Sequence, residues 1–155
     1  MDTIATPDAL ACRRPLLLRR LAALFYDFWV CLAIWLLLSA LITLVWTLAG
    51  HAPRENIAPF SAWQITLWMG CWGLTGLYAV ASWRRGGQTL GMRPWKVAVV
   101  DAGGGAAQTA ALWRRFAWGT LSVLPAGLGF WWALLDRQGL TLHDRLSGTR
   151  LVRAD

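Results

Sequence analysis

The sequence predicts an all-α membrane protein with two transmembrane helices in a hairpin, a third, broken hydrophobic segment, and a small cytoplasmic β element. Of the 155 residues, 57% are apolar and only 15% are charged, whereas a soluble domain carries about 25% charged residues. Three long apolar runs also contain no charged residue. The chain has 12 tryptophans, and tryptophan is enriched at membrane–water interfaces. These observations exclude a disordered chain, a disulfide scaffold and an ordinary soluble enzyme domain.

The runs without Asp, Glu, Lys or Arg cover residues 28–53, 56–83 and 116–135. A helix of about 20 mostly apolar residues crosses the hydrocarbon core of a bilayer, so the first two runs can each cross it with room for tilt. We expect a cytoplasmic tail over residues 1–14 and a single membrane domain over residues 15–153. Within that domain, helix 1 covers about 16–49 and helix 2 about 60–82.

The third run lies in a segment over about 107–136, between a cytoplasmic loop at 84–106 and a C-terminal segment at 137–155. A proline and two glycines interrupt this run near its middle. Either the segment spans the membrane, or two half-helices, at 107–124 and 127–136, dip in and return to the cytoplasmic side. The re-entrant form is favoured, because a single crossing would place the arginines after residue 136 outside, against the positive-inside rule.

The chain carries a net charge of +7, and its basic residues lie at the edges of the apolar runs. The loop between helices 1 and 2 holds only Arg54, which Glu55 neutralises. By the positive-inside rule, the N-terminus is therefore cytoplasmic. This placement of the basic residues favours anionic lipid headgroups of the bilayer as their partners, and no nucleic-acid binding is expected.

Two short segments have strand character. Residues 95–100 are rich in valine, and Asp101 with the glycines after it predicts a turn. Residues 149–153 form the second candidate strand. We expect the two strands to pair into a small ladder on the cytoplasmic side.

Asp27 is the residue in helix 1 that calls for an explanation. An ionised carboxylate inside a spanning helix costs about 2.5–3.5 kcal/mol, so it should be neutral, paired or hydrated. Arg20 lies seven residues earlier on the same face, but it is about 10 Å away along the axis and its side chain points away from Asp27. We therefore expect a partner from another segment, with Arg114, Arg115 and Arg145 as candidates, or else a proton or small cation.

No catalytic, metal or cofactor site is expected. His143 stands beside Asp144, but no nucleophile accompanies the pair at a recognisable spacing. The two histidines, His51 and His143, fall on opposite sides of the expected membrane, and the three cysteines show no CxxC spacing. An enzyme is therefore not expected, and Asp144 is expected to cap a turn or bind an arginine.

Three short polar segments occur in the chain in a fixed order, each beside an apolar run or a strand. They are Arg19-Arg20-Leu21 with Asp27, Gly87-Gln88-Thr89-Leu90-Gly91-Met92-Arg93 with Val99-Val100-Asp101, and Leu142-His143-Asp144-Arg145-Leu146-Ser147-Gly148-Thr149. Together they resemble the pattern of the RDD family of small bacterial membrane proteins, over about residues 13–153. Met92 departs from that pattern, because a basic residue often stands there.

The resemblance implies a polar set of one arginine and two aspartates. Arg20 and Asp27 match the first two by their seven-residue offset, and the second aspartate is Asp144, with Asp136 as the alternative. The resemblance also implies a multi-pass protein of the bacterial inner membrane, and transport of unidentified ligands is suggested for the family.

Two functional hypotheses follow. In the first, the chain works as a homo-oligomer that moves a proton or small cation together with an unknown ligand, and Asp27 carries the ion. In the second, the chain is a non-transporting membrane scaffold or assembly partner, and the arginine–aspartate set is a structural clip. Replacing Asp27 by asparagine separates them, because a translocator loses activity with its fold intact, whereas a clip loses its fold or its partner.

Overall fold

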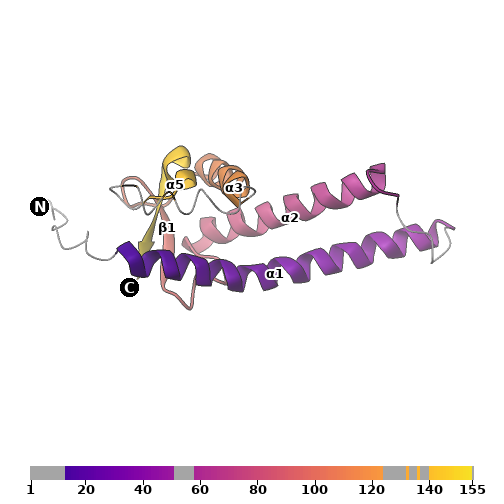
Figure 1. The fold of residues 1–155 in the computed structure, drawn as a ribbon, viewed down its shortest axis with the longest axis horizontal. Coiled ribbons are helices and arrows are strands. Elements are labelled where there is room, and N and C mark those ends of the chain that lie inside the picture. The colour runs from indigo at the N-terminus through magenta and orange to yellow at the C-terminus, as the bar shows by residue number, and fades with distance from the viewer. Residues whose placement is uncertain (1–12, 51–57, 124–131, 133–135, 137–139, 155) are drawn as a thin grey trace, which may run out of the picture.

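The computed structural model describes residues 13–50, 58–123, 132, 136 and 140–154. Its elements in chain order are α1 (Arg13–Leu48), α2 (Ala62–Gly86), β1 (Val97–Asp101), α3 (Thr109–Val123), α5 (Leu142–Ser147) and β2 (Thr149–Arg153). Helices α1 and α2 form a long hairpin, and the shorter elements gather at one end of it, around the start of α1 and the end of α2 (Figure 1). We call these shorter elements, together with the loop over residues 87–96, the end unit.

Helices α1 and α2 pack along each other as an antiparallel pair. Near the middle of the hairpin, the Trp35 indole N–H donates to Thr75 Oγ1 at 2.8 Å. At the end far from the end unit, the rings of Trp46 and Trp63 meet edge to face with centroids 5.2 Å apart. The two contacts bring successively later residues of α1 against earlier residues of α2, as a hairpin requires.

Both helices are long and apolar enough to cross a membrane. The apolar stretch of α1 covers Leu18–Leu48, 31 residues, and that of α2 covers Ala62–Gly86, 25 residues. Large apolar side chains on both are exposed, such as Leu37 at 73% and Trp68 at 52%, and extended exposed apolar surface of this kind is typical of contact with lipid. The prediction of two long helices in a hairpin is thus confirmed, and both have the length and composition of membrane helices.

Helix α2 extends one turn beyond its expected end at residue 82. Gly87 ends the helix in a left-handed conformation with φ of 70° and returns its N–H to the Trp83 carbonyl. Glycine adopts this conformation without strain, which makes it a common residue at helix C-termini. Arg84 and Arg85 therefore lie on the last turn of the helix.

Strands β1 and β2 pair antiparallel, with Val97 opposite Arg153 and Asp101 opposite Thr149. This confirms the predicted pairing, although β1 begins two residues later than the expected strand. At the end of β1, Asp101 Oδ1 accepts a hydrogen bond from Gly105 N–H at 2.7 Å. Asp101 is therefore the turn residue that the sequence predicts.

The core of the end unit is small. Its buried residues come from the sheet, from α3, from the loop and from the hairpin, and they are Val97, Val99, Leu151, Leu112, Met92, Ala23 and Val80. Ala23 lies on α1 and Val80 on α2, so the core also joins the end unit to the hairpin. A core of this size leaves much of the orientation of the end unit to polar contacts.

The third apolar segment is described only in its first half. Helix α3 is close to the predicted half-helix at 107–124, whereas the predicted half-helix at 127–136 lies outside the described residues, apart from Trp132 and Asp136. Helix α3 packs tightly on α2, since a Cβ added at Gly76 would lie 2.7 Å from Phe116 Cε1. Helix α5 was not expected in the C-terminal segment.

Candidate functional site

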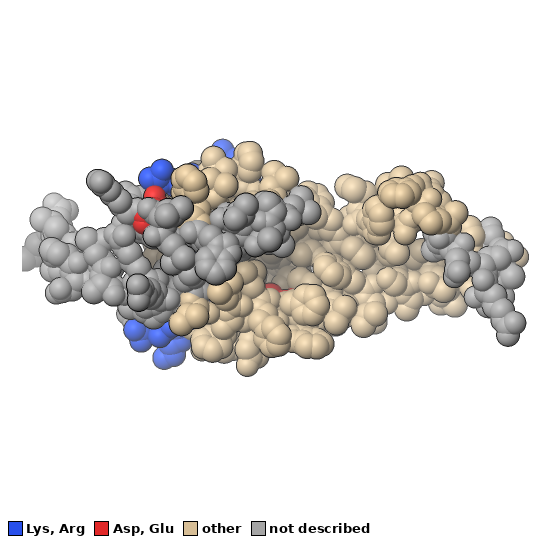
Figure 2. All heavy atoms as spheres, viewed as in Figure 1, with Lys and Arg blue, Asp and Glu red and all other residues tan. Residues whose placement is uncertain are grey.

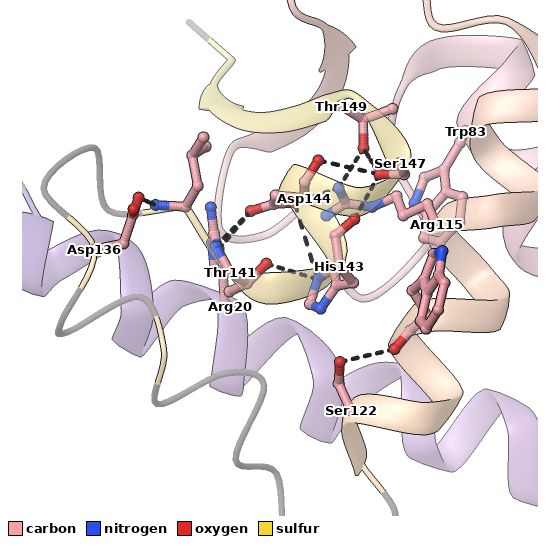
Figure 3. Close-up of polar contacts among 12 residues, drawn as sticks. Arg20, Trp83, Arg115, Ser122, Asp136, Thr141, His143, Asp144, Ser147 and Thr149 are labelled. Atoms are coloured by element: carbon pink, nitrogen blue, oxygen red, sulfur yellow. Dashed lines mark hydrogen bonds and ion pairs between the residues drawn. The ribbon is translucent and has the colours of Figure 1, made fainter.

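A buried ion cluster joins three elements of the fold (Figure 3). Asp144 of α5 lies between Arg20 of α1 and Arg115 of α3. Arg20 Nη1 is 2.8 Å from Asp144 Oδ2, and Arg115 Nη1 donates a hydrogen bond to Asp144 Oδ1. Asp144 is 1% exposed and each arginine 6%. Since a charge is stable in a protein interior only when it is paired and hydrogen-bonded, each member of this cluster depends on the others.

The first turn of α5 fixes the position of Asp144. Thr141 precedes the helix in an extended conformation, and its N–H donates to Asp144 Oδ2 at 3.2 Å. This is the backbone contact of a capping box, in which an acidic side chain at the third helical position reaches back to the residue before the helix. Gly148, with φ of 69°, then ends α5 and leads the chain into β2.

Arg115 connects the ion cluster to the neighbouring elements. Its Nη1 also donates to Thr149 Oγ1 on β2 at 2.8 Å, and Thr149 Oγ1 lies 2.7 Å from Ser147 Oγ. The Ser147 hydroxyl in turn donates to the His143 carbonyl at 2.6 Å. On its other side, the Arg115 guanidinium lies over the Trp83 ring of α2, 5.5 Å from the ring centre, in a cation–π contact. One side chain thus ties α2, α3, α5 and β2 together.

The charges of the cluster follow from burial and from its two arginines. Burial alone would raise the pKa of Asp144, but Arg115 and Arg20 outweigh burial and hold the pKa well below its usual range. Burial, followed by the charge of Arg115, lowers the pKa of His143 to about 3. At neutral pH, Asp144 is therefore ionised and His143 is neutral, with its Nε2 3.0 Å from Thr141 Oγ1. The cluster combines two positive charges with one negative charge.

A second polar cluster surrounds Asp27. The Tyr78 hydroxyl and the Gly91 N–H donate to Asp27 Oδ1, at 2.8 Å and 2.9 Å, and the Thr89 hydroxyl donates to Oδ2. Leu90 N–H donates to the Tyr78 hydroxyl at 3.1 Å. Asp27 Oδ1 thus accepts hydrogen bonds from α2 and from the loop over residues 87–96, and Oδ2 accepts one from the loop. Asp27 holds this loop against the hairpin.

Gly91 allows the loop to reach α1. A Cβ added at Gly91 would lie 2.7 Å from both Asp27 N and Asp27 Cγ, and closer still to the Ala23 carbonyl oxygen. Only a residue without a side chain lets the two backbones approach this closely. The close contact with Asp27 therefore explains why the second polar segment has glycine at position 91.

The structure corrects the expectation for the partners of Asp27. Arg115 binds Asp144, Arg145 forms its ion pair with Asp136 at the end of the third segment, and Arg114 is exposed on α3. Among the described residues, the partners of Asp27 are neutral donors rather than arginines. The partners of Asp27 come from other segments, as expected, but they are hydroxyl and amide groups.

The second aspartate of the polar set is also distinguished by the structure. Asp136 Oδ1 lies 3.2 Å from Arg145, whose side chain is 55% exposed, and Asp136 Oδ2 accepts from Leu140 N–H at 2.9 Å. Asp144 is the aspartate that meets Arg20. The structure therefore brings Arg20 and Asp144 together, holds Asp27 in a separate cluster, and agrees with the expectation that Arg20 and Asp27 do not pair directly.

Several hydrogen-bond donors of the two clusters escaped the sequence analysis. Thr89 and Thr149 lie inside the polar segments quoted above, so the resemblance marks their neighbourhood but not their role. The sequence does not indicate a role for Tyr78 or Thr141, because a single hydroxyl in an apolar or turn-rich stretch is not distinctive. In the described part of the chain, no group of three or more His, Cys, Asp or Glu side chains is placed to hold a metal ion.

The two apolar helices, with the end unit packed at one end of them, define a small helical membrane protein. The chain belongs to the RDD family, whose model matches residues 14–148. Searches among curated proteins and among solved structures found no significant match. The family thus agrees with the resemblance seen in the three polar segments.

Proposed function

We propose that the chain is a multi-pass protein of the bacterial inner membrane, with the start of α1, the end of α2 and the end unit on the cytoplasmic side. Strand β1 follows α2 after a short loop and pairs with β2, so β2 lies on the side where α2 ends. Arg20, near the start of α1, contacts Asp144 just before β2. On the face shown in Figure 2, the exposed basic side chains gather at this end, which supports a cytoplasmic location under the positive-inside rule.

The same contacts support a re-entrant third segment. Helix α3 begins soon after β1, and α5 lies just before β2, so both ends of the third segment lie on the side of the membrane where the two strands pair. A single crossing over 107–136 would separate two strands that pair with each other. The re-entrant form is therefore the one we propose.

A reporter fused after Asp155 is expected to be cytoplasmic. Green fluorescent protein at this point should fluoresce, and alkaline phosphatase should be inactive, because the phosphatase folds only outside the cytoplasm. The control fusion at Gly50, between α1 and α2, should give the opposite pair of results. Active phosphatase at both positions would show that the third segment crosses the membrane once.

We further propose that the protein is a non-transporting membrane scaffold or assembly partner, in which Arg20, Asp27 and Asp144 fasten the end unit to the hairpin. One observation carries this proposal: the carboxylate oxygens of both aspartates are already bound by donors of the chain itself. A carboxylate that carries an ion has to exchange its partners in each cycle. Donors that are fixed on both carboxylates instead favour one arrangement of the chain.

The position of Asp27 also supports a structural role. Its partner Tyr78 lies about 12 Å along α2 from the helix end at Gly86, and the backbone of the loop over residues 87–96 reaches this same level. Irregular backbone is stable at membrane depth only when protein or water surrounds it. We therefore place the edge of the hydrocarbon near Tyr78, so Asp27 lies at this edge rather than in the middle of the bilayer.

Proton- or cation-coupled transport through Asp27 is the second candidate. It is favoured by the set of oxygen atoms that Asp27, Tyr78 and Thr89 bring together between two apolar helices. Hard cations prefer such oxygen ligands, and ionisable residues in spanning helices often mark ion pathways. Under this alternative, the donors on Asp27 would give way to a cation or proton.

Asp27→Asn is expected to lower the melting temperature of the purified protein and to leave cation flux unchanged. The asparagine amide presents N–H groups to at least one donor that now points at the carboxylate, and an unsatisfied buried polar group costs about 1–3 kcal/mol. Flux is measured with a pH-gradient dye in proteoliposomes, and melting is measured by tryptophan fluorescence in detergent.

The matched control is Asp101→Asn, which removes the same charge from the turn after β1. This variant is expected to change neither measurement. Flux that is present in the wild-type protein and lost in a well-folded Asp27→Asn variant would overturn the scaffold proposal and favour transport.

A further inference from the structure

Helix α3 is the part of the end unit that packs against α2, and it also packs against α5. Arg115 lies over Trp83, the ring of Phe116 is 5.1 Å from that of Trp72, and the Trp72 indole N–H donates to Thr120 Oγ1 at 3.3 Å. Later residues of α3 thus meet earlier residues of α2, so the two helices run antiparallel. Trp83 and Trp72 are about 16 Å apart along α2.

The far end of α3 passes the proposed edge of the hydrocarbon. That edge lies near Tyr78, and Trp72 is about 9 Å further along α2 from it. Thr120 contacts Trp72, so the last turn of α3 lies at the depth of the acyl chains. The first turns of α3 lie closer to the headgroups than its last turn does.

The side of α3 that faces away from α2 changes from polar to apolar along its length. Ala110, Arg114, Trp118 and Leu121 share one helical face, and all four are exposed. Trp118 and Leu121, at 39% and 53% exposure, occupy the deeper half. Arg114 lies one turn closer to the start of α3, and helical side chains point toward the N-terminus of their helix. The guanidinium is therefore directed toward the headgroup level.

Within the described residues, Arg114 makes no ion pair. The acidic side chains among the described residues have other partners. Asp27 and Asp144 belong to the two clusters, Asp136 pairs with Arg145, and Asp101 accepts from Gly105 N–H. A guanidinium presents planar donors that match the oxygens of a phosphate. A phosphate at the membrane edge therefore supplies the countercharge that the chain lacks at this point.

We propose that the outer face of α3 is a lipid-binding surface, formed by Arg114, Trp118 and Leu121. Arg114 binds the phosphate of an anionic phospholipid on the side of the end unit, and Trp118 and Leu121 contact the acyl chains. This inference rests on α1 and α2 crossing the membrane, and it holds whether or not the protein transports an ion.

Lipid retention in native mass spectrometry tests the headgroup contact. The protein in detergent is titrated with phosphatidylglycerol or with phosphatidylcholine. We expect the wild-type protein to prefer phosphatidylglycerol and Arg114→Gln to weaken its apparent affinity about fivefold. The matched control is Arg150→Gln, an exposed arginine on β2, which should retain the wild-type affinity. Equal losses in the two variants, no preference between the lipids, or displacement of the lipid by millimolar inorganic phosphate would each overturn the proposal.

Spin labels test the depth of α3 separately. In a variant without cysteines, labels are placed at Leu121→Cys or Ala110→Cys, and their accessibility to oxygen and to a water-soluble nickel complex is compared in phosphatidylglycerol vesicles. The label at 121 should be more accessible to oxygen and less accessible to nickel than the label at 110. Equal accessibility at the two positions would show that α3 does not enter the acyl region, whatever the flux experiment on Asp27 shows.

Discussion

Asp144→Asn is expected to destabilise the protein by about 3–5 kcal/mol. Asparagine has the size of aspartate, but it leaves Arg20 and Arg115 buried without a countercharge, and each of these arginines is only 6% exposed. An uncompensated buried charge is far more costly than the loss of one surface ion pair. In thermal melts followed by tryptophan fluorescence, the apparent melting temperature should fall by on the order of 10 °C.

Two further variants show whether charge burial causes this loss. Asp136→Asn weakens the ion pair with Arg145, in which the aspartate side chain is 6% exposed and the arginine side chain 55%, and it should cost less than Asp144→Asn, because Arg145 stays in contact with water. Replacing Arg20 and Arg115 by methionine together with Asp144→Leu removes all three charges and should recover most of the lost stability. If Asp144→Asn melts at the same temperature as Asp136→Asn, the ion cluster does not hold the end unit in place.

Gly91→Ala is expected to detach the loop over residues 87–96 from α1, at a cost of about 3 kcal/mol. The added Cβ would lie 2.7 Å from Asp27 N and would also collide with the Ala23 carbonyl. Both atoms belong to the backbone of a long helix, which cannot yield as a flexible side chain does. The loop has to move instead, and Asp27 then loses the donors that Thr89 and Gly91 supply. Melting in detergent measures the loss of stability.

Gly73→Ala is the matched glycine control for this experiment. Nothing lies within 4 Å of a Cβ added at Gly73 in α2, and alanine is a better helix former than glycine by about 1 kcal/mol. This variant should melt at the wild-type temperature or slightly above it. A Gly91→Ala protein that behaves in the same way would contradict the close approach of the loop to α1.

The hairpin and the sheet could be predicted because their signals are local. Two charge-free runs are long enough to specify spanning helices whatever the rest of the chain does. The strand pairing spans a long stretch of sequence, yet it could also be predicted, because the valines of β1 and the segment over 149–153 were the two stretches with strand character. Helix α5 escaped prediction, since six residues are too few for a helical period to be visible.

The partners within the two clusters could not be predicted, because they depend on how helices are rotated against one another. Arg114 and Arg115 are adjacent in sequence, and only the packing of α3 on α2 turns Arg115 toward Asp144 and leaves Arg114 outside. The donors on Asp27 are neutral hydroxyl and amide groups. A search for an opposite charge therefore could not find them.

The ion cluster has a consequence for the order of events during synthesis. Arg20 of α1 is synthesised well before Asp144 of α5, and domains generally acquire their structure from the N-terminus onward. Until α5 is made, Arg20 and Arg115 lack the carboxylate that pairs with both of them, so the end unit can close only after residue 144 has been synthesised. A chain that stops between α3 and α5 therefore carries two arginines without the countercharge that Asp144 supplies.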